Sequence, residues 1–181
     1  MSDPIVVVPY DPGWPVLFCE LGHRLRQALG DIAVRIDHVG STAVPGLAAK
    51  PVLDVQVSVA TLEPLDAYRL PLEAAGWSWR ADNPDLTKRY FREVPGGQRT
   101  HVHVRQAGSF GEQITLLFRD YLRAHPDEAS SYAALKYRLA KEFRDDRPRY
   151  VESKGPFVWQ VLARASTWSQ ANGWQPGPSD A

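Results

Sequence analysis

One short stretch of the sequence, "GSTAVPGLAAKPVLD", combines the residue types that bind phosphate groups and metal ions. Gly40, Ser41 and Thr42 follow one apolar run, and Asp54 lies within the next. A glycine lets a ligand approach the backbone, and the two hydroxyl groups with their amides suit phosphate oxygens. Lys50 adds positive charge between the two ends. We therefore expect a nucleotide and metal site, in which Asp54 binds a divalent metal or acts as a base and the other four residues bind the substrate.

The same residues also have a purely structural interpretation. Gly-Ser-Thr is a common turn sequence, and a single aspartate on a strand can simply face water. Spacing alone leaves both interpretations open.

Two histidines form a second candidate group. In "THVHVR", strand alternation puts His101, His103 and Arg105 on one face. A pair of histidines two residues apart, together with Asp54, could hold a transition metal, although such a pair is more often hydrogen-bonded structure or a ligand contact. Because imidazole titrates near neutral pH, we expect His101 and His103 to contact substrate or transfer a proton, with Arg105 binding substrate beside them.

Further basic residues are candidates for contacts to an acidic substrate. Alternation puts Lys88 and Arg92 on one face of a predicted hairpin strand, where a solvated charged face is the alternative. Lys136 and Lys154 lie in predicted helices near the C-terminus, and either approach the site or cap and solubilise those helices. We include Lys88, Lys136 and Lys154 in the predicted substrate site.

Two predicted strands carry the first group of residues. The first covers residues 33–39, and the second covers residues 52–59 and alternates strictly, so that Asp54 and Gln56 share one face. Gln56 is therefore expected to contact substrate as well. For His38, the sequence favours an orientation toward the site and one toward the core equally.

The other predicted elements must position these residues. They begin with an opening strand at 5–10, an amphipathic helix at 14–29, a helix interrupted by Pro71 at 62–75 and a hairpin at 86–105. Three final helices are predicted at 112–126, 129–146 and 154–173. Strands early and helices late around one sheet indicate an α/β or α+β domain. We expect a single domain over residues 1–174 and a frayed, flexible tail at 175–181.

Composition restricts the class of protein. The 181 residues are 44% apolar, enough for one sizeable core, and 21 basic residues balance 21 acidic ones. The neutral charge gives no general attraction to nucleic acid or to anionic membranes, so we expect a small-molecule or nucleotide ligand as the partner. The single cysteine, Cys19, falls in an apolar helical pattern and is expected to be a buried thiol. Without a leader or an apolar run of roughly 20 residues, the expected location is the cytoplasm.

The stretch from residue 36 to 51 has a wider resemblance. It reads Ile-x-His-x-Gly-Ser-Thr-x-Val-Pro-Gly-Leu-x-x-Lys-Pro and resembles the signature of the GrpB family, in which a strand with Asp follows. Similar family patterns recur in the same order in "HVHV", "LLFRDYLRAHP", "YAALKYRLA" and "YVESKGPFV". The resemblance therefore extends from Trp14 to about Trp168.

The resemblance implies a nucleotidyltransferase-like mixed β-sheet with helices packed on it and a helical C-terminal third. Active nucleotidyltransferases have Gly-Ser at the start of a short helix and two carboxylates on the next strand, which hold divalent metals. Gly40 and Ser41 match the first element, and Asp54 matches the first carboxylate. Gln56 replaces the second, and an amide binds Mg²⁺ much more weakly. The implied cofactor is Mg²⁺ or another divalent metal at Asp54.

Two functions remain in competition. One is an enzyme of the nucleotidyltransferase superfamily, a transferase with a degenerate metal site that acts on a nucleotide or another phosphorylated or acidic small molecule. The other is a non-catalytic nucleotide- or cofactor-binding module, which Gln56 favours. GrpB-like domains also occur fused behind dephospho-coenzyme A kinase, which supports a binding role near nucleotide-containing cofactors.

Overall fold

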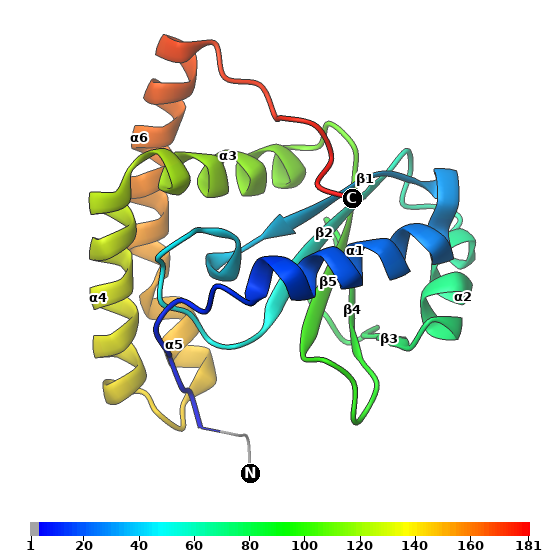
Figure 1. Ribbon diagram of the computed structural model, residues 1–181, viewed down its shortest axis with the longest axis horizontal. Helices are drawn as coiled ribbons and strands as arrows, with labels where there is room; N and C mark the ends of the chain where they lie inside the picture. Colours follow the sequence, from blue (N-terminus) through cyan, green and yellow to red (C-terminus); the bar gives the residue numbers. More distant parts are fainter. Residues whose placement is uncertain (1–3) are drawn as a thin grey trace.

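Five strands form one mixed sheet in the order β1-β2-β5-β4-β3 (Figure 1). The structure is a computed structural model that describes residues 4–181. Strands β1 and β2 are antiparallel, β2 and β5 are parallel, and β4 and β3 continue the sheet in antiparallel pairing. The strands cover Ala33–Val39 (β1), Leu53–Val59 (β2), Trp77–Trp79 (β3), Arg89–Glu93 (β4) and Thr100–Gln106 (β5). The predicted mixed sheet is confirmed, and "GWSWR" supplies its edge strand.

Helices α1 (Trp14–Leu29) and α2 (Asp66–Ala74) cover one face of the sheet (Figure 1). Fully buried apolar side chains from both helices and from four strands fill this layer, among them Leu25, Ile36, Val55, Val57, Leu72, Phe91, Val102 and Val104. Since side chains alternate along a strand, burial of the valines on this face turns the polar residues of β2 and β5 toward the opposite face.

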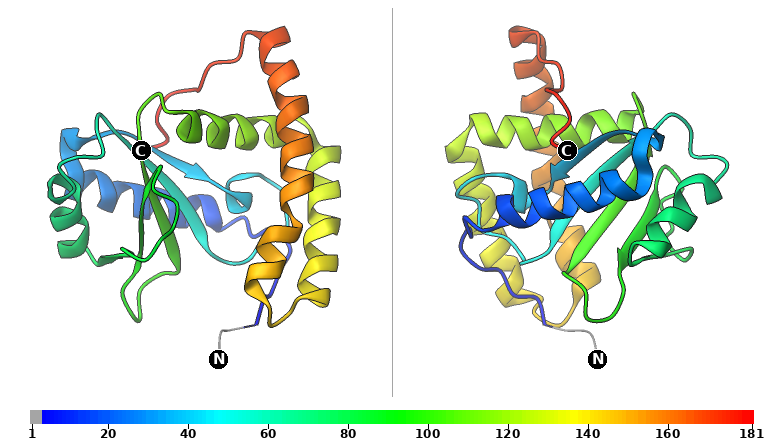
Figure 2. Two further views of the ribbon diagram at one scale, coloured as in Figure 1. Left: turned by 180° about the vertical axis from the view of Figure 1, so that it is seen from behind. Right: turned by 45° about the vertical axis from the view of Figure 1, so that its right-hand side comes forward.

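The last third of the chain is helical, as predicted, and contains four helices. They are α3 (Phe110–Ala124), α4 (Pro126–Glu142), α5 (Arg147–Ser153) and α6 (Gly155–Asn172). A second apolar core joins them to the loop after β1, through Val44 and Leu47 packed against Tyr121, Leu122, Tyr132 and Val161. Below, α4, α5 and α6 are called the helical layer; seen from behind, this layer stands beside the sheet (Figure 2).

Some local predictions were wrong. Residues 5–10 form no strand, and Val8 makes an isolated bridge with Ala49. Cys19 is exposed rather than buried, because one residue turns the helix by about 100° away from the buried Phe18. The helix predicted at 129–146 begins at Pro126 and ends at Glu142, and the separate helix α5 was not predicted.

The C-terminal segment expected to form a frayed tail lies against β1 (Figures 1 and 2). The amides of Asp180 and Ala181 donate to the carbonyl of Ile36. The carboxylate of Asp180 accepts from the amide of His38 and from Arg119 Nη1, both at 2.9 Å. This segment therefore contacts the strand that leads into the Gly-Ser-Thr loop.

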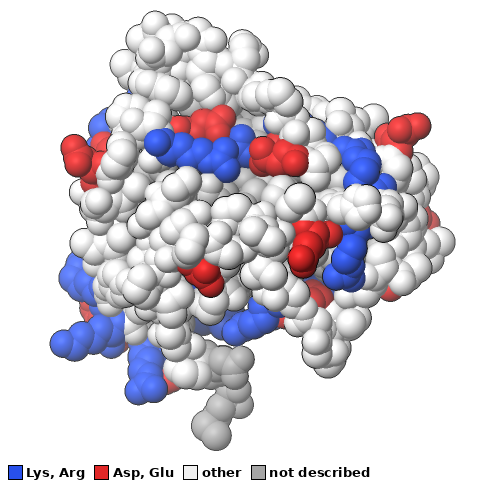
Figure 3. All heavy atoms as spheres, viewed as in Figure 1, with Lys and Arg blue, Asp and Glu red and all other residues white. Residues whose placement is uncertain are grey.

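Charged side chains of both signs share the surface. On the face drawn in Figure 3, acidic and basic groups lie next to one another along the upper part, and basic groups gather at the lower end of the helical side. Within residues 4–181, every helix is too short or too polar to cross a membrane.

Candidate functional site

A cleft of about 550 Å³ opens between the polar face of the sheet and the helical layer. Its walls come from the loop after β1, from β2, β4 and β5, and from α4 and α5. Nine predicted site residues line it: Ser41, Thr42, Lys50, Asp54, Lys88, His101, His103, Lys136 and Lys154. Strand pairing brings the central ones together, because Asp54 is the parallel-strand partner of His101 and Gln56 is the partner of His103.

Asp54 lies between the two histidines. Its Oδ1 atom is 3.1 Å from Nδ1 of His101 and 3.3 Å from Nε2 of His103. Burial alone would raise the pKa of Asp54, but the hydrogen bonds from His101 and His103 outweigh it and lower that pKa well below its usual range. Burial also lowers the pKa of His103, although Asp54 opposes this. These three residues, called the Asp54 cluster below, form a group that could hold a metal ion.

Tyr90 supports both imidazole rings and was missed by sequence analysis. Its ring stacks on His103 at 5.3 Å with planes 25° apart, and meets His101 edge-on at 5.6 Å. A signal was present, since Tyr90 lies midway between Lys88 and Arg92, on the strand face already assigned to the site. Burial raises the pKa of Tyr90 to about 12, so its hydroxyl stays protonated at neutral pH.

The Gly-Ser-Thr loop turns sharply at Gly40. This residue has φ = 71°, and the short helix η2 (Ser41–Ala43) follows. A Cβ atom on Gly40 would lie 2.7 Å from Oδ2 of Asp54, closer than any normal contact. The loop is held from α3, where Arg123 Nε donates to the carbonyl of Ala43 at 2.9 Å. Glycine is therefore required here both by backbone conformation and by the approach of Asp54.

His38 lies on the core side of β1 and not in the cleft. Its ring stacks on Phe18 at 4.7 Å with planes 3° apart, and its Nε2 is 2.9 Å from Oγ1 of Thr42. Burial, followed by repulsion from Arg123, lowers the pKa of His38 to about 4. The side chain thus supports the loop from behind in its neutral form.

Gly40→Ala is expected to destabilise the protein more than Gly46→Ala, the matched control. Both glycines have positive φ, 71° and 77°, but a Cβ atom on Gly46 would meet no heavy atom within 4 Å. Each substitution should cost about 1–3 kcal/mol from backbone strain, and only Gly40→Ala adds a clash with Asp54. Urea denaturation measures both; equal losses would show that the contact with Asp54 has no energetic consequence.

Basic residues line the wall of the cleft opposite the Asp54 cluster. This basic wall consists of Lys50, Lys136 on α4, Arg147 on α5 and Lys154 between α5 and α6. Burial and then the neighbouring lysines lower the pKa of Lys136 to about 7, and burial and then Lys50 lower that of Lys154 to about 8. Burial and then Arg147 lower the pKa of Lys50.

Aromatic rings and a backbone carbonyl are the contacts of these lysines. Lys154 and Lys50 lie 4.7 and 5.6 Å from the ring of Tyr150, and Lys136 donates to the carbonyl of Ala48. Within residues 4–181, none of the four basic-wall residues forms an ion pair with a carboxylate. The wall therefore has positive charge without a directly paired carboxylate, and the anion that favours the charged forms of Lys50 and Lys154 is Asp54.

Gln56 does not line the main cleft. It is fully buried, and its Nε2 donates to the backbone carbonyl of Glu112 at 3.3 Å. With Gly40 and Arg105, it borders a smaller hollow of about 180 Å³ that shares Asp54, Lys88 and His103 with the cleft. Because this amide takes the place of the second carboxylate, the residues present do not fit a pair of Mg²⁺ ions.

Three further residues of the cleft had weak or no sequence signals. Tyr150 begins the pattern "YVESKGPFV" but was not assigned a role, while Asn83 and Arg147 lie in segments without periodicity. Tyr150 and Arg147 reach the cleft on α5, and Asn83 reaches it in the segment before β4, because the chain folds back at both places.

Comparisons with known proteins agree with this architecture. A family model described as "GrpB protein" matches residues 4–164. UPF0157 protein YqkA of Bacillus subtilis is 34% identical over 166 residues, or 92% of this chain, and dephospho-CoA kinase of Mycolicibacterium paratuberculosis is 36% identical over an alignment of 198 positions that includes 96% of this chain. The chain spans about half the length of these two relatives, 48% and 49%.

Solved structures show the same fold. The crystal structure of the conserved protein GrpB from Enterococcus faecalis has a TM-score of 0.81 and 33% identity, and the match covers 90% of this chain and 99% of that one. The structure of Cid1 in complex with its short product ApU has a TM-score of 0.52 and 18% identity, with 75% of this chain and 43% of that chain covered. The sheet and its helices thus have a nucleotidyltransferase-like fold.

Proposed function

The chain belongs to the GrpB family, and we propose that its cleft binds a nucleotide or another phosphorylated or acidic small molecule and acts on it. The observation that carries this proposal is the basic wall. Buried and half-buried cations without a directly paired carboxylate raise the free energy of the empty protein, and a bound anion would offset that cost. Ser41 and Thr42, at the N-terminal end of η2, add hydroxyl donors for the same anion.

The Asp54 cluster would supply the reactive groups. Because the pKa of Asp54 is lowered, this carboxylate is a weak proton acceptor, and it is better suited to orient the imidazoles. His101 and His103 border the same cleft, and an imidazole can both donate and accept a proton through its ring nitrogens. In the metal-free cleft, proton transfer to or from the ligand is therefore assigned to the histidines, with Asp54 as their positioning residue.

The relatives support a nucleotide-containing ligand. One of them is a dephospho-CoA kinase, whose name specifies a substrate that contains an adenine nucleotide, and Cid1 was solved in complex with ApU. Nucleotides and coenzyme A precursors are accordingly the first compounds to test.

Melting temperatures test the proposal. We expect ATP, ADP, dephospho-coenzyme A or pyrophosphate, in EDTA, to raise the melting temperature, since a ligand at a hundred times its Kd stabilises by about 2.7 kcal/mol. Lys154→Gln should remove most of this rise. Lys141→Gln, on the exposed surface of α4, is the control and should retain it. If no phosphorylated compound changes the melting temperature at millimolar concentration, the proposal is wrong.

The pH dependence provides a second signature of the same site. Anion affinity should fall as pH rises through 7 to 8, because Lys136 and Lys154 lose their protons there. Stability of the free protein should change in the opposite direction. The unfolded chain binds more protons than the folded one between the lowered pKa values and 10.5, so these lysines make stability rise with pH in that range. Titration calorimetry at pH 6.5, 7.5 and 8.5 measures how the anion affinity depends on pH. Urea denaturation at the same pH values measures how the stability depends on pH.

A non-catalytic binding module is the second candidate, and the position of Gln56 favours it. A side chain that donates to the Glu112 carbonyl cannot replace a metal-binding carboxylate, so conventional two-metal transfer is absent in this alternative. Recovery of the ligand after prolonged incubation separates the two. Intact ligand at every metal condition supports the module, whereas new products that Asp54→Asn no longer forms support the enzyme.

A further inference from the structure

We propose that Asp54, His101 and His103 bind a single transition-metal ion of the Zn²⁺ type. The proposal deepens the proposed function and rests on it for the role of the ion beside a bound anion. Metal binding itself can be measured without any other ligand.

The separations between the donor atoms carry the proposal. Oδ1 of Asp54 is 3.1 Å from Nδ1 of His101 and 3.3 Å from Nε2 of His103, and one ligand atom from each of the three residues lies within 4.8 Å of the other two. Two donors bound to one tetrahedral ion at about 2.0–2.1 Å lie about 3.3 Å apart. The three atoms therefore occupy positions that need only small rotations to surround one ion. Within residues 4–181, no other group of three such side chains meets this condition.

The scaffold holds these donors rigidly. Asp54 and His101 are register partners on the parallel strands β2 and β5, and His103 follows on the same face. Tyr90 packs against both imidazoles, and the absence of a side chain at Gly40 leaves room for the other oxygen of Asp54. Donors on central strands keep their geometry better than donors on loops, which favours binding of one preferred metal.

The donor types select the class of metal. Two imidazole nitrogens and one carboxylate suit Zn²⁺, Fe²⁺, Co²⁺ or Ni²⁺, whereas Mg²⁺ prefers six oxygen ligands. Three protein donors leave at least one position of a four-coordinate ion open for water or a ligand oxygen. Since the cluster and the basic wall line the same cleft, that ligand would be the anion of the proposed function.

The charges in the cleft couple the binding of the metal ion to the binding of the anion. Lys50, Lys88 and Lys154 also face this cleft, so they oppose any cation that enters alone. A bound phosphate would reduce this repulsion, and the ion would in turn attract the phosphate. By linkage, phosphate should raise the affinity for the metal by the same factor by which the metal raises the affinity for phosphate.

Equilibrium dialysis of the EDTA-treated full chain against Zn²⁺ and Co²⁺ tests the proposal. We expect one ion per chain, a visible Co²⁺ spectrum of low coordination number, and no displacement by millimolar Mg²⁺. Asp54→Asn, His101→Gln and His103→Gln should each lose the ion, while His23→Gln, an exposed histidine on α1, should retain it. A hydrogen-bonded cluster without a metal predicts equal, weak binding by all variants, which would overturn the proposal.

Ring-proton NMR of the unchanged protein replaces the variants if any of them fails to fold. Zn²⁺ should shift the resonances of His101 and His103 and leave those of His23 and His125 unchanged; any other pattern contradicts the site. Phosphate binding in EDTA separates this proposal from the proposed function. Phosphate binding without metal binding refutes the metal site alone, and metal binding without any phosphorylated ligand refutes only the proposed function.

Discussion

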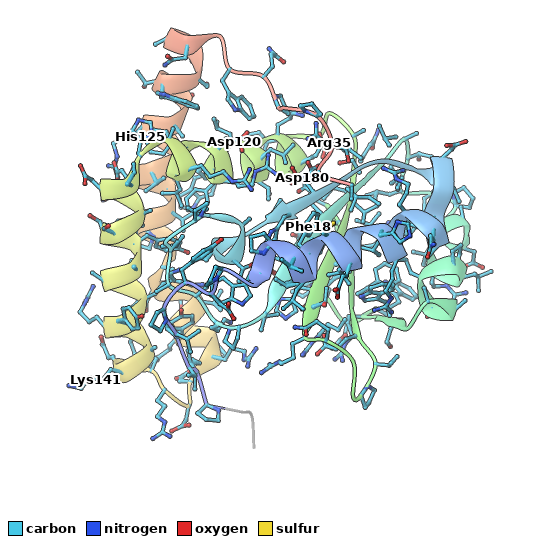
Figure 4. All side chains as sticks on the ribbon, in the orientation of Figure 1. Phe18, Arg35, Asp120, His125, Lys141 and Asp180 are labelled. Carbon is cyan, nitrogen blue, oxygen red and sulfur yellow. The ribbon has the colours of Figure 1, made fainter. Side chains whose placement is uncertain are left out.

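Arg119→Met is expected to lower the free energy of unfolding by about 3–5 kcal/mol, the cost of breaking a buried ion pair from one side. Arg119 is only 3% exposed, and its Nη1 donates to Asp180 at 2.9 Å and to the carbonyl of His38 at 3.1 Å. Its Nε donates to Asp120 at 2.7 Å. Asp120, Arg35 and Asp180 gather between α3, β1 and the C-terminal segment in Figure 4.

The loss should be large because it removes a charged partner from several buried or half-buried groups at once. Asp37 is fully buried beside Arg119 and would keep only Arg35, which binds it at 2.6 and 2.7 Å. A domain is typically stable by about 5–15 kcal/mol, so the variant would approach the limit of folding. Urea denaturation measures the change.

Arg69→Met is the control, since Arg69 forms ion pairs with Asp66 and Glu73 on the exposed side of α2. Exposed pairs contribute little, so this variant should unfold almost as the unchanged protein does. If both variants lost equally little, the network around Arg119 would have no role in stability. A secondary effect is weaker anion binding by Arg119→Met, because the arginine also holds the strand that leads to Gly40.

Lys136→Met is expected to raise stability at pH 7 and to weaken anion binding by about tenfold to a hundredfold. Lys136 is 3% exposed and carries its charge beside Lys154 and Lys50, which is why its pKa falls to about 7. Removing the charge removes the cost of desolvating a buried ammonium group and the repulsion from the neighbouring lysines. The lost hydrogen bond to the carbonyl of Ala48 costs about 0.5–1.5 kcal/mol. A lost charged hydrogen bond to ligand, about 1.5–3 kcal/mol, gives the decrease in affinity.

A rise in stability together with a fall in anion affinity distinguishes a lysine that binds the ligand from one with a structural role. Thermal denaturation gives the stability, and titration with pyrophosphate or ATP gives the affinity. Lys141→Met is the matched control, because Lys141 lies on the same helix and points away from the protein in Figure 4. If Lys136→Met lowered the melting temperature and left affinity unchanged, Lys136 would be a packing residue and its place in the basic wall would be incidental.

Local patterns in the sequence already determined much of the fold. Alternation in "VLDVQVSV" separated the buried Val55 and Val57 from Asp54, and the same rule put His101 and His103 on one face of their strand. The spacing of apolar residues located α1 and the main helices of the last third. These features depend on residues within a few positions of each other, which is why a single sequence was enough.

Only the tertiary structure decided which of these faces meet. The parallel pairing of β2 with β5 brings Asp54 to His101 across 47 residues, and the hairpin then adds Tyr90. Likewise, α4 and the junction between α5 and α6 bring Lys136 and Lys154 to a wall opposite that cluster. Periodicity fixes the direction of a side chain on its own element, whereas strand register and helix packing follow from burial of apolar surface across the whole chain.

The same reason explains the residues whose place sequence alone left undecided or misjudged. His38 could face either way until Phe18 on α1 packed over its ring. Gln56 does share a strand face with Asp54, but α3 covers it and its amide donates to Glu112, 56 residues away, so it is closed off from the main cleft. The sequence by itself thus determined the strands, the helices and the reactive residue types, and long-range packing decided which of those residues share one cleft.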